Sequence, residues 1–114
     1  MFGMKLKWYP LFESESELEN LFAVKKTAVH KSIFGEVLLV KNDSGYHAFK
    51  NKCAHQNKPL NGCWTEDNSV VCPFHKYHFD IDSGQGHGTY IDKYELRFVD
   101  AKVEIGKEIW SIFN

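Results

Sequence analysis

Short runs of apolar residues, separated by turn-forming residues, make up most of this chain. Many of the runs are rich in valine, isoleucine, tyrosine, phenylalanine and tryptophan, a composition typical of β-strands. The pattern predicts nine strands, over residues 8–12, 27–33, 36–41, 46–51, 70–72, 77–81, 94–98, 102–105 and 108–113.

Turn signals lie between nearly all of these runs. The segment Asn42-Asp43-Ser44-Gly45 predicts a hairpin connection, Gly35 predicts another turn, and Gly106-Lys107 predicts a turn between the last two strands. Strands joined by short turns pair with antiparallel neighbours. The chain is therefore expected to be all-β, an antiparallel sandwich or barrel.

One segment follows a helical pattern instead. Residues 14–22 place Leu18, Leu21 and Phe22 at helical spacing, and Ser14 or Ser16 is available as an N-terminal cap. The glutamates of this segment are interpreted as its solvated face. One or two turns of helix are expected here.

Composition and charge exclude several functions. A chain of 114 residues with 43% hydrophobic residues is expected to form one compact domain. Its net charge of -1 argues against a nucleic-acid or acidic-lipid surface. The longest aliphatic run, residues 37–40, is far too short to span a membrane. The N-terminus lacks the apolar core of a secretory signal, so a cytoplasmic location is expected.

Two pairs of metal-binding side chains lie between residues 53 and 75. Cys53 and His55 form a Cys-x-His pair, Cys72 and His75 form a Cys-x-x-His pair, and sixteen residues separate the pairs. Tetrahedral zinc also accepts two cysteines and two histidines, but in the usual zinc-finger spacing one pair consists of two cysteines and the other of two histidines. Because each pair here offers one thiolate and one imidazole, the spacing favours a centre of two irons.

The residues that flank these pairs complete a longer motif. It reads Cys53-Ala54-His55-Gln56 with Pro59-Leu60 and Gly62, then Cys72-Pro73-Phe74-His75, then Phe79-Asp80 before Ser83-Gly84. This motif resembles the Rieske [2Fe-2S] domain family, and most of all its small soluble ferredoxins. The resemblance implies one domain over residues 1–114, with cluster-binding loops at about 52–84. It also implies three antiparallel β-sheets with a small cluster-binding subdomain and one short helix.

The resemblance assigns the four ligands by position. Cys53 and Cys72 would bind the inner iron of one [2Fe-2S] cluster per chain, and His55 and His75 the outer iron, with their imidazole edges toward solvent. Such a protein carries electrons and is not itself catalytic. The implied partners are proteins: a flavin reductase that draws on NAD(P)H, and a terminal oxygenase or a reductase subunit.

Several positions depart from the family pattern. High-potential respiratory members carry a serine and a tyrosine where this chain has Tyr77 and Phe79, which predicts a potential on the order of -150 mV, the low end of the Rieske range. Lys76 places a cation beside the outer edge, where it is expected either to raise the potential or to favour an acidic partner. The family's third loop often contains prolines, but residues 86–92 have none.

Three further side chains invite functional interpretations. His78 and His87 suggest a second metal site or a proton relay, but isolated histidines among aromatic and glycine residues are usually surface or packing residues. Cys63 is interpreted as a small loop or core residue instead of a redox thiol.

Three functions remain open from the sequence. The leading hypothesis is a soluble Rieske-type ferredoxin that carries one electron at a time between an NAD(P)H-dependent reductase and a terminal oxygenase or similar enzyme. The alternatives are a small Rieske subunit of a complex like nitrite reductase and an iron–sulfur redox sensor. A self-contained oxygenase is disfavoured, because the chain has no room for a separate mononuclear iron domain.

Overall fold

The computed structural model describes residues 4–52, 59–60, 62–73 and 76–110. At residues 4–6 and 108–110 the structure describes the backbone alone. The elements follow in the order β1 (Met4–Phe12), α1 (Glu15–Leu21), β2 (Thr27–Ser32), β3 (Gly35–Asn42), β4 (Gly45–Lys50), β5 (Trp64–Glu66), β6 (Ser69–Val71), β7 (His78–Asp80), β8 (Gln85–Gly86), β9 (Thr89–Tyr90), β10 (Lys93–Val99) and β11 (Lys102–Trp110).

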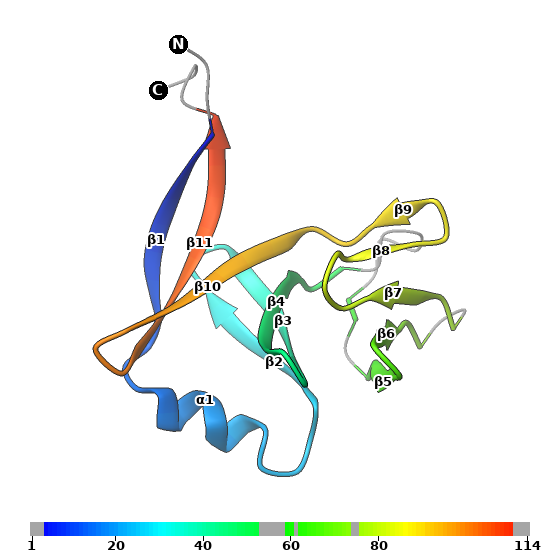
Figure 1. Ribbon diagram of the computed structural model, residues 1–114, viewed down its shortest axis with the longest axis horizontal. Coiled ribbons are helices and arrows are strands. Elements are labelled where there is room, and N and C mark those ends of the chain that lie inside the picture. The colour runs from blue at the N-terminus through cyan, green and yellow to red at the C-terminus, as the bar shows by residue number, and fades with distance from the viewer. Residues whose placement is uncertain (1–3, 53–58, 61, 74–75, 111–114) are drawn as a thin grey trace.

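The strands form three antiparallel sheets. A six-stranded sheet has the order β1-β11-β10-β4-β3-β2, a three-stranded sheet has the order β5-β6-β7, and β8 pairs with β9. The two small sheets lie together on one side of the large sheet, and α1 lies at the lower end of the large sheet in this view (Figure 1). The predicted all-β class, with antiparallel sheets and one short helix, is confirmed.

Strand β3 separates two hydrophobic cores. Its central residues, Val37, Leu38, Leu39 and Val40, are all buried, and successive side chains of a strand point to opposite faces. Leu38 and Val40 belong to the core beneath the small sheets, whereas Val37 and Leu39 belong to the core that α1 covers. This continuous apolar run therefore forms a strand that is buried on both faces.

Aromatic side chains bring the two edges of the large sheet together. The rings of Phe12 in β1 and His30 in β2 have their centroids 4.4 Å apart. Phe34, in the β2–β3 turn, lies edge-on to Tyr9 at 5.3 Å and stacks on Tyr94 at 5.2 Å. These contacts close the sheet into a barrel-like shape without pairing its edge strands, and they support the sandwich or barrel expected from the sequence.

Helix α1 covers one end of this barrel-like sheet. Leu18 is buried in the core beneath the helix, and Phe22 follows it at the helix end. Ser14 is the N-cap, as expected, but its side chain makes no capping hydrogen bond. Instead Glu17 accepts a hydrogen bond from the backbone N–H of Glu13 at 3.1 Å. None of the helices in the described part of the chain is long and apolar enough to cross a membrane.

The turn predicted at Gly106-Lys107 is wrong, because β11 runs without a break from Lys102 to Trp110. Gly106 lies directly across from Trp8 in β1, and a side-chain carbon added at Gly106 would lie 2.8 Å from the Trp8 ring. The guanidinium of Arg97 lies over the same ring, 4.4 Å from its centroid. The glycine here makes room for an aromatic side chain in a strand and does not mark a turn.

Candidate metal centre

Only one of the four predicted ligands lies in the described part of the chain. Cys72 directly follows β6 and its side chain is fully buried. Cys53, His55 and His75 lie outside the described residues. The convergence of the four side chains on one centre therefore stays a prediction.

Hydrogen bonds close the base of the second ligand loop. The N–H of Cys72 donates to the carbonyl of Tyr77 at 2.9 Å, and the N–H of Lys76 donates to the carbonyl of Cys72 at 2.9 Å. Lys76 is exposed and has a left-handed backbone with φ of 56°. The two bonds fix the backbone of Cys72 to the far side of its own loop, so the thiol has a defined position at the loop base.

A buried amide holds the first ligand loop. Asn51 immediately precedes this loop and is the one buried polar residue in the described part of the chain. Its side-chain oxygen accepts the N–H of Leu60 at 2.9 Å, and the N–H of Cys63 then donates to the Leu60 carbonyl at 3.0 Å. Asn51 thus ties the two ends of the loop together. Sequence reasoning missed it; the signal was an asparagine directly after an apolar strand and shortly before Cys53.

An apolar core underlies both loops. Leu60 from the first loop and Cys72 from the second belong to one cluster of buried side chains. Val70, Phe79 and Ile81 are among its other fully buried members. A thiolate at Cys72 therefore has an apolar layer beneath it, which keeps water away from that side of the site and raises the cost of an unmatched charge.

Cys63 belongs to the same core, as expected from the sequence. Its side chain is buried, and the hydroxyl of Thr27 donates to its backbone carbonyl at 3.4 Å. Burial raises the pKa of the Cys63 thiol to about 11. Because thiolates and not thiols are the reactive form, this residue is a poor redox thiol at neutral pH.

The backbone of His78 and the ring of His87 lie beside each other. The N–H of His78 donates to Nε2 of His87 at 3.0 Å. Nε2 of His78 lies 4.0 Å from a carboxylate oxygen of Glu66, whose other contact is the indole N–H of Trp64 at 3.1 Å. Within the described residues no group of three or more histidine, cysteine, aspartate or glutamate side chains is placed to hold a metal ion.

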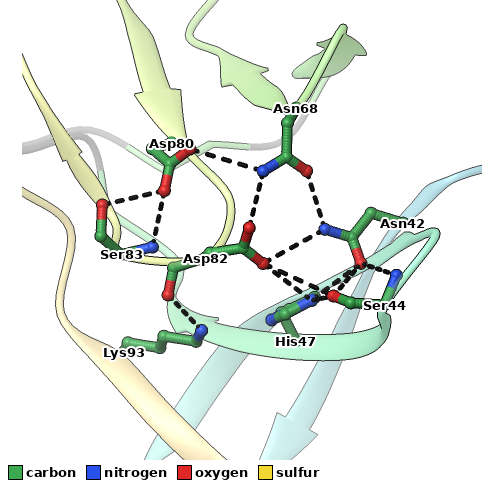
Figure 2. Close-up of polar contacts among 8 residues, drawn as sticks. All are labelled: Asn42, Ser44, His47, Asn68, Asp80, Asp82, Ser83 and Lys93. Atoms are coloured by element: carbon green, nitrogen blue, oxygen red, sulfur yellow. Dashed lines mark hydrogen bonds and ion pairs between the residues drawn. The ribbon is translucent and has the colours of Figure 1, made fainter.

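A polar junction joins the small three-stranded sheet to the large sheet (Figure 2). The side-chain amide of Asn42, at the end of β3, donates to the side-chain oxygen of Asn68 in the β5–β6 turn at 2.8 Å. Asn68 in turn donates to the carboxylate of Asp82 at 2.8 Å, and Lys93 of β10 donates to the backbone carbonyl of Asp82 at 2.6 Å. These bonds fix the orientation of the sheet that carries Cys72.

Two titratable groups of the polar junction have shifted pKa values. Hydrogen bonds, that from Asn68 first, lower the pKa of the exposed Asp82 carboxyl. Burial, with Lys93 adding to it, lowers the pKa of His47 even though Asp82 lies 3.8 Å away. Desolvation outweighs the attraction of that carboxylate, so His47 is neutral at pH 7 and the contact is not an ion pair. Neutral His47 lies 2.9 Å from the side-chain oxygen of Asn42.

The polar junction should make the protein less stable in acid. Because the pKa of His47 is lowered from 6.5 by folding, the unfolded chain binds more protons once the pH falls below about 6.5, and the free energy of unfolding then decreases. The pKa of Asp82 is lowered from 3.8 by folding, so this carboxyl adds a further loss of stability as the pH falls below about 4. We expect the melting temperature to decrease from pH 7 to pH 5, and to decrease less in the variant His47→Gln. An equal decrease of the melting temperature in the wild type and in His47→Gln would contradict this role of His47.

The donor set is compatible with an iron–sulfur cluster and unlike a magnesium or calcium site. The one described ligand, Cys72, is a thiol at a loop base above an apolar layer. The sequence has one imidazole three residues after it, at His75, and a second thiol and imidazole at Cys53 and His55. Soft thiolates and imidazoles suit iron–sulfur centres, whereas carboxylate oxygens suit magnesium and calcium.

Comparison with known proteins shows a match to one protein family and similarity to several ferredoxins. The model of the Rieske [2Fe-2S] domain matches residues 7–93. The ferredoxin component of the alkene monooxygenase system of Xanthobacter autotrophicus is 35% identical over 77 residues, which are 64% of this chain and 63% of that protein. The match thus spans less than two thirds of that relative's length.

Two solved structures have the same fold. A ferredoxin of Sphingomonas yanoikuyae B1 superimposes with a TM-score of 0.69 at 20% identity, covering 89% of this chain and 99% of that one. The ferredoxin of carbazole 1,9a-dioxygenase from Nocardioides aromaticivorans IC177 superimposes with a TM-score of 0.68 at 17% identity, covering 83% of this chain and 93% of that one. At these identities the likeness concerns the fold alone.

Proposed function

Because this chain belongs to the Rieske [2Fe-2S] domain family, we propose that it carries one electron at a time between an NAD(P)H-dependent reductase and a terminal oxygenase or similar enzyme. The observation that carries this proposal is its similarity, at 35% identity, to the ferredoxin component of an oxygenase system. The position of Cys72 supports this proposal. Its side chain is buried, but Lys76 in the same loop is exposed, and an electron carrier needs a redox centre that is fixed in place near the surface.

We propose Cys53 and Cys72 as the thiolate ligands, and His55 and His75 as the imidazole ligands. When bound, the family's [2Fe-2S] cluster supplies the one-electron redox couple. The protein's part is to position the ligands. The bonds at the base of the second loop fix Cys72, and Asn51 ties the two ends of the first loop. Because Lys76 directly follows His75 and is exposed, the imidazole side is the side from which partners would exchange electrons.

Reduction by a partner tests this function. Anaerobically purified protein, mixed with NADH and an NAD(P)H-dependent flavin reductase of an oxygenase system, should lose visible absorption and recover it on oxidation. One electron per chain should be taken up. Failure to cycle reversibly would contradict the proposal. Isolation from its native host in a stable stoichiometric complex with a large flavin- or sirohaem-containing subunit would instead identify it as a fixed subunit of a complex like nitrite reductase.

Lysines near the proposed ligands indicate the kind of partner surface. Residues 52–63 and 72–78 contain three lysines, Lys52, Lys58 and Lys76, and no acidic residue, although the whole chain has a net charge of -1. Charges within about 10 Å of the point of contact dominate an encounter at ordinary ionic strength. The partner is therefore expected to offer an acidic surface to these loops.

The charge at Lys76 can be measured with a small anionic oxidant. Oxidation of the reduced protein by ferricyanide should slow as ionic strength rises, opposite to what the net negative charge predicts. The variant Lys76→Gln should react about threefold more slowly at low salt and depend less on salt. Lys31→Gln, an exposed lysine of β2, is the matched control and should react like the wild type. A wild-type rate that rises with ionic strength would contradict the acidic-partner expectation.

A further inference from the structure

We propose that His87 is a positioning residue that holds the second ligand loop through a hydrogen bond from its ring to the backbone of His78. This inference rests on the proposed function, because it assigns His87 a role toward the loop that carries Cys72 and His75. His87 is exposed and its ring packs on Tyr77, which agrees with the sequence-based interpretation of a surface or packing residue, and the proposal adds a role in holding the loop.

The hydrogen bond lies at a free sheet edge. In an antiparallel ladder, hydrogen-bonded and non-hydrogen-bonded residue pairs alternate. Cys72 and Tyr77 are bonded across the β6–β7 hairpin, and Val71 lies across from His78. His78 therefore belongs to a non-hydrogen-bonded pair, and its N–H and C=O point away from β6. Strand β7 is the edge of its sheet, so these two groups face the β8–β9 hairpin.

The β8–β9 hairpin contacts both of these groups. Nε2 of His87 accepts the His78 N–H at 3.0 Å. Next to it, Gly86 passes so close to the His78 carbonyl that a side-chain carbon added at Gly86 would overlap that oxygen. A glycine permits the approach of the two backbones, and the adjacent histidine supplies an acceptor that a strand would otherwise provide. A side chain thus takes the place of a further strand at this edge.

The turn itself presents the His87 ring. His87 and Gly88 are the two residues between the paired Gly86 and Thr89, and their φ angles are 53° and 80°. Two consecutive positive φ values are those of a type I′ hairpin turn. Histidine is one of the few residues other than glycine that is enriched in this left-handed conformation. The local sequence Gly-His-Gly therefore fixes both the turn and the direction of the ring.

Ring contacts add to the hydrogen bond. The His87 ring lies 4.7 Å from the ring of Tyr77, centroid to centroid, and 6.3 Å from the buried ring of Phe79. Because Nε2 accepts the His78 N–H, that ring nitrogen carries no proton in this arrangement. Tyr77 is the residue whose carbonyl is bonded to Cys72. His87 thus reaches the ligand loop by two routes, through the backbone of His78 and through the side chain of Tyr77.

This arrangement also accounts for the absence of proline from residues 86–92. Where prolines stiffen a shielding loop, they do so by fixing the backbone. Here a two-residue turn, a close approach at Gly86 and the bond from His78 hold the segment against β7. Of these three features, the bond to the His87 side chain is the one that a substitution at position 87 removes.

Variants at position 87 separate the hydrogen bond from the ring. His87→Phe keeps a ring toward Tyr77 but removes the acceptor, His87→Asn suits the left-handed turn and keeps an acceptor on a shorter side chain, and His87→Gly keeps only the turn. In intact protein we expect His87→Phe and His87→Gly to exchange the His78 amide hydrogen about fivefold faster, the factor that one ordinary hydrogen bond supports. Hydrogen–deuterium exchange on the peptide that spans residues 76–80 measures this.

The effect on the metal centre has its own readouts. In His87→Phe and His87→Gly, visible absorption should decay about tenfold faster under a chelator, the loss typical of residues that support metal ligands. Their midpoint potential should shift in the positive direction, because water that reaches a loosened loop stabilises the more negative reduced state. His87→Asn should lie between these variants and the wild type.

A control variant distinguishes positioning from general destabilisation. Phe22→Leu, in the core that α1 covers, should lower the melting temperature without changing chelator release or the midpoint potential. If the position 87 variants match the wild type in exchange, release and potential, the role of His87 is overturned while the carrier function stands. If the wild-type chain itself shows no reversible redox couple, the proposed function fails first.

Discussion

Replacing Cys72 with alanine is expected to leave the purified protein without iron, acid-labile sulfide or visible absorption. Cys72 supplies one of the two thiolates in the proposed ligand set, and without it the inner iron would have only one protein ligand, Cys53. Cys63, the other cysteine of this core in the described part of the chain, has its thiol pKa raised to about 11 by burial and is not expected to take the place of Cys72. Iron and sulfide analysis with an absorption spectrum measures the result.

The matched control deletes the same sulfur atom from a neighbouring cysteine. Cys63 belongs to the same buried core as Cys72, but its thiol pKa is raised to about 11 by burial and it is not part of the ligand motif. Cys63→Ala should therefore retain the full iron and sulfide content, at a small cost in stability. If Cys63→Ala lost the metal and Cys72→Ala kept it, the ligand assignment would be wrong.

Replacing Phe79 with alanine should have the largest effect on stability. The Phe79 side chain is fully buried, and it belongs to the core shared by the small sheet and both ligand loops. Removal of a buried phenylalanine ring costs about 3–5 kcal/mol, because apolar burial is lost and a cavity remains. That is a large part of the roughly 5–15 kcal/mol that holds a typical domain together. Urea unfolding followed by circular dichroism measures the loss.

An exposed phenylalanine is the control for this substitution. Phe98 near the end of β10 is 45% exposed, so its replacement by alanine should cost less than about 1.5 kcal/mol. The variant Phe79→Ala should also release its metal more readily, since the apolar layer beneath Cys72 is then incomplete. Similar unfolding free energies for the two variants would contradict the placement of Phe79 at the centre of this core.

The sequence predicted the elements whose pattern depends on local burial. The apolar run at residues 37–40 lies in β3, and the turn at residues 42–45 connects β3 to β4, as predicted. A continuous apolar run and a glycine-containing turn are compatible with few other local structures. The ligand spacing likewise indicated a Rieske domain, and the family match and the fold confirm that resemblance. The predicted low potential and the four ligands themselves remain predictions.

Features that depend on contacts between distant segments escaped the sequence. Gly106 was read as a turn because nothing near it in the chain reveals that the Trp8 ring lies above it. The short strands β5, β8 and β9 were missed, because two or three residues carry too little periodicity to detect. The role proposed for His87 was equally invisible, since its partner His78 is nine residues away and the contact involves only the partner's backbone.

Metal and ligand analysis of the anaerobically purified chain tests the central claim most directly. Two irons and two acid-labile sulfides per chain are predicted, together with couplings from two histidine nitrogens in the electron–nuclear double resonance spectrum of the reduced protein. In the variant His75→Ala, any cluster that remains should show a coupling from one histidine nitrogen instead of two. A chain that holds one zinc and no sulfide, or a cluster without nitrogen couplings, would contradict the assignment of Cys53, His55, Cys72 and His75 as the ligands.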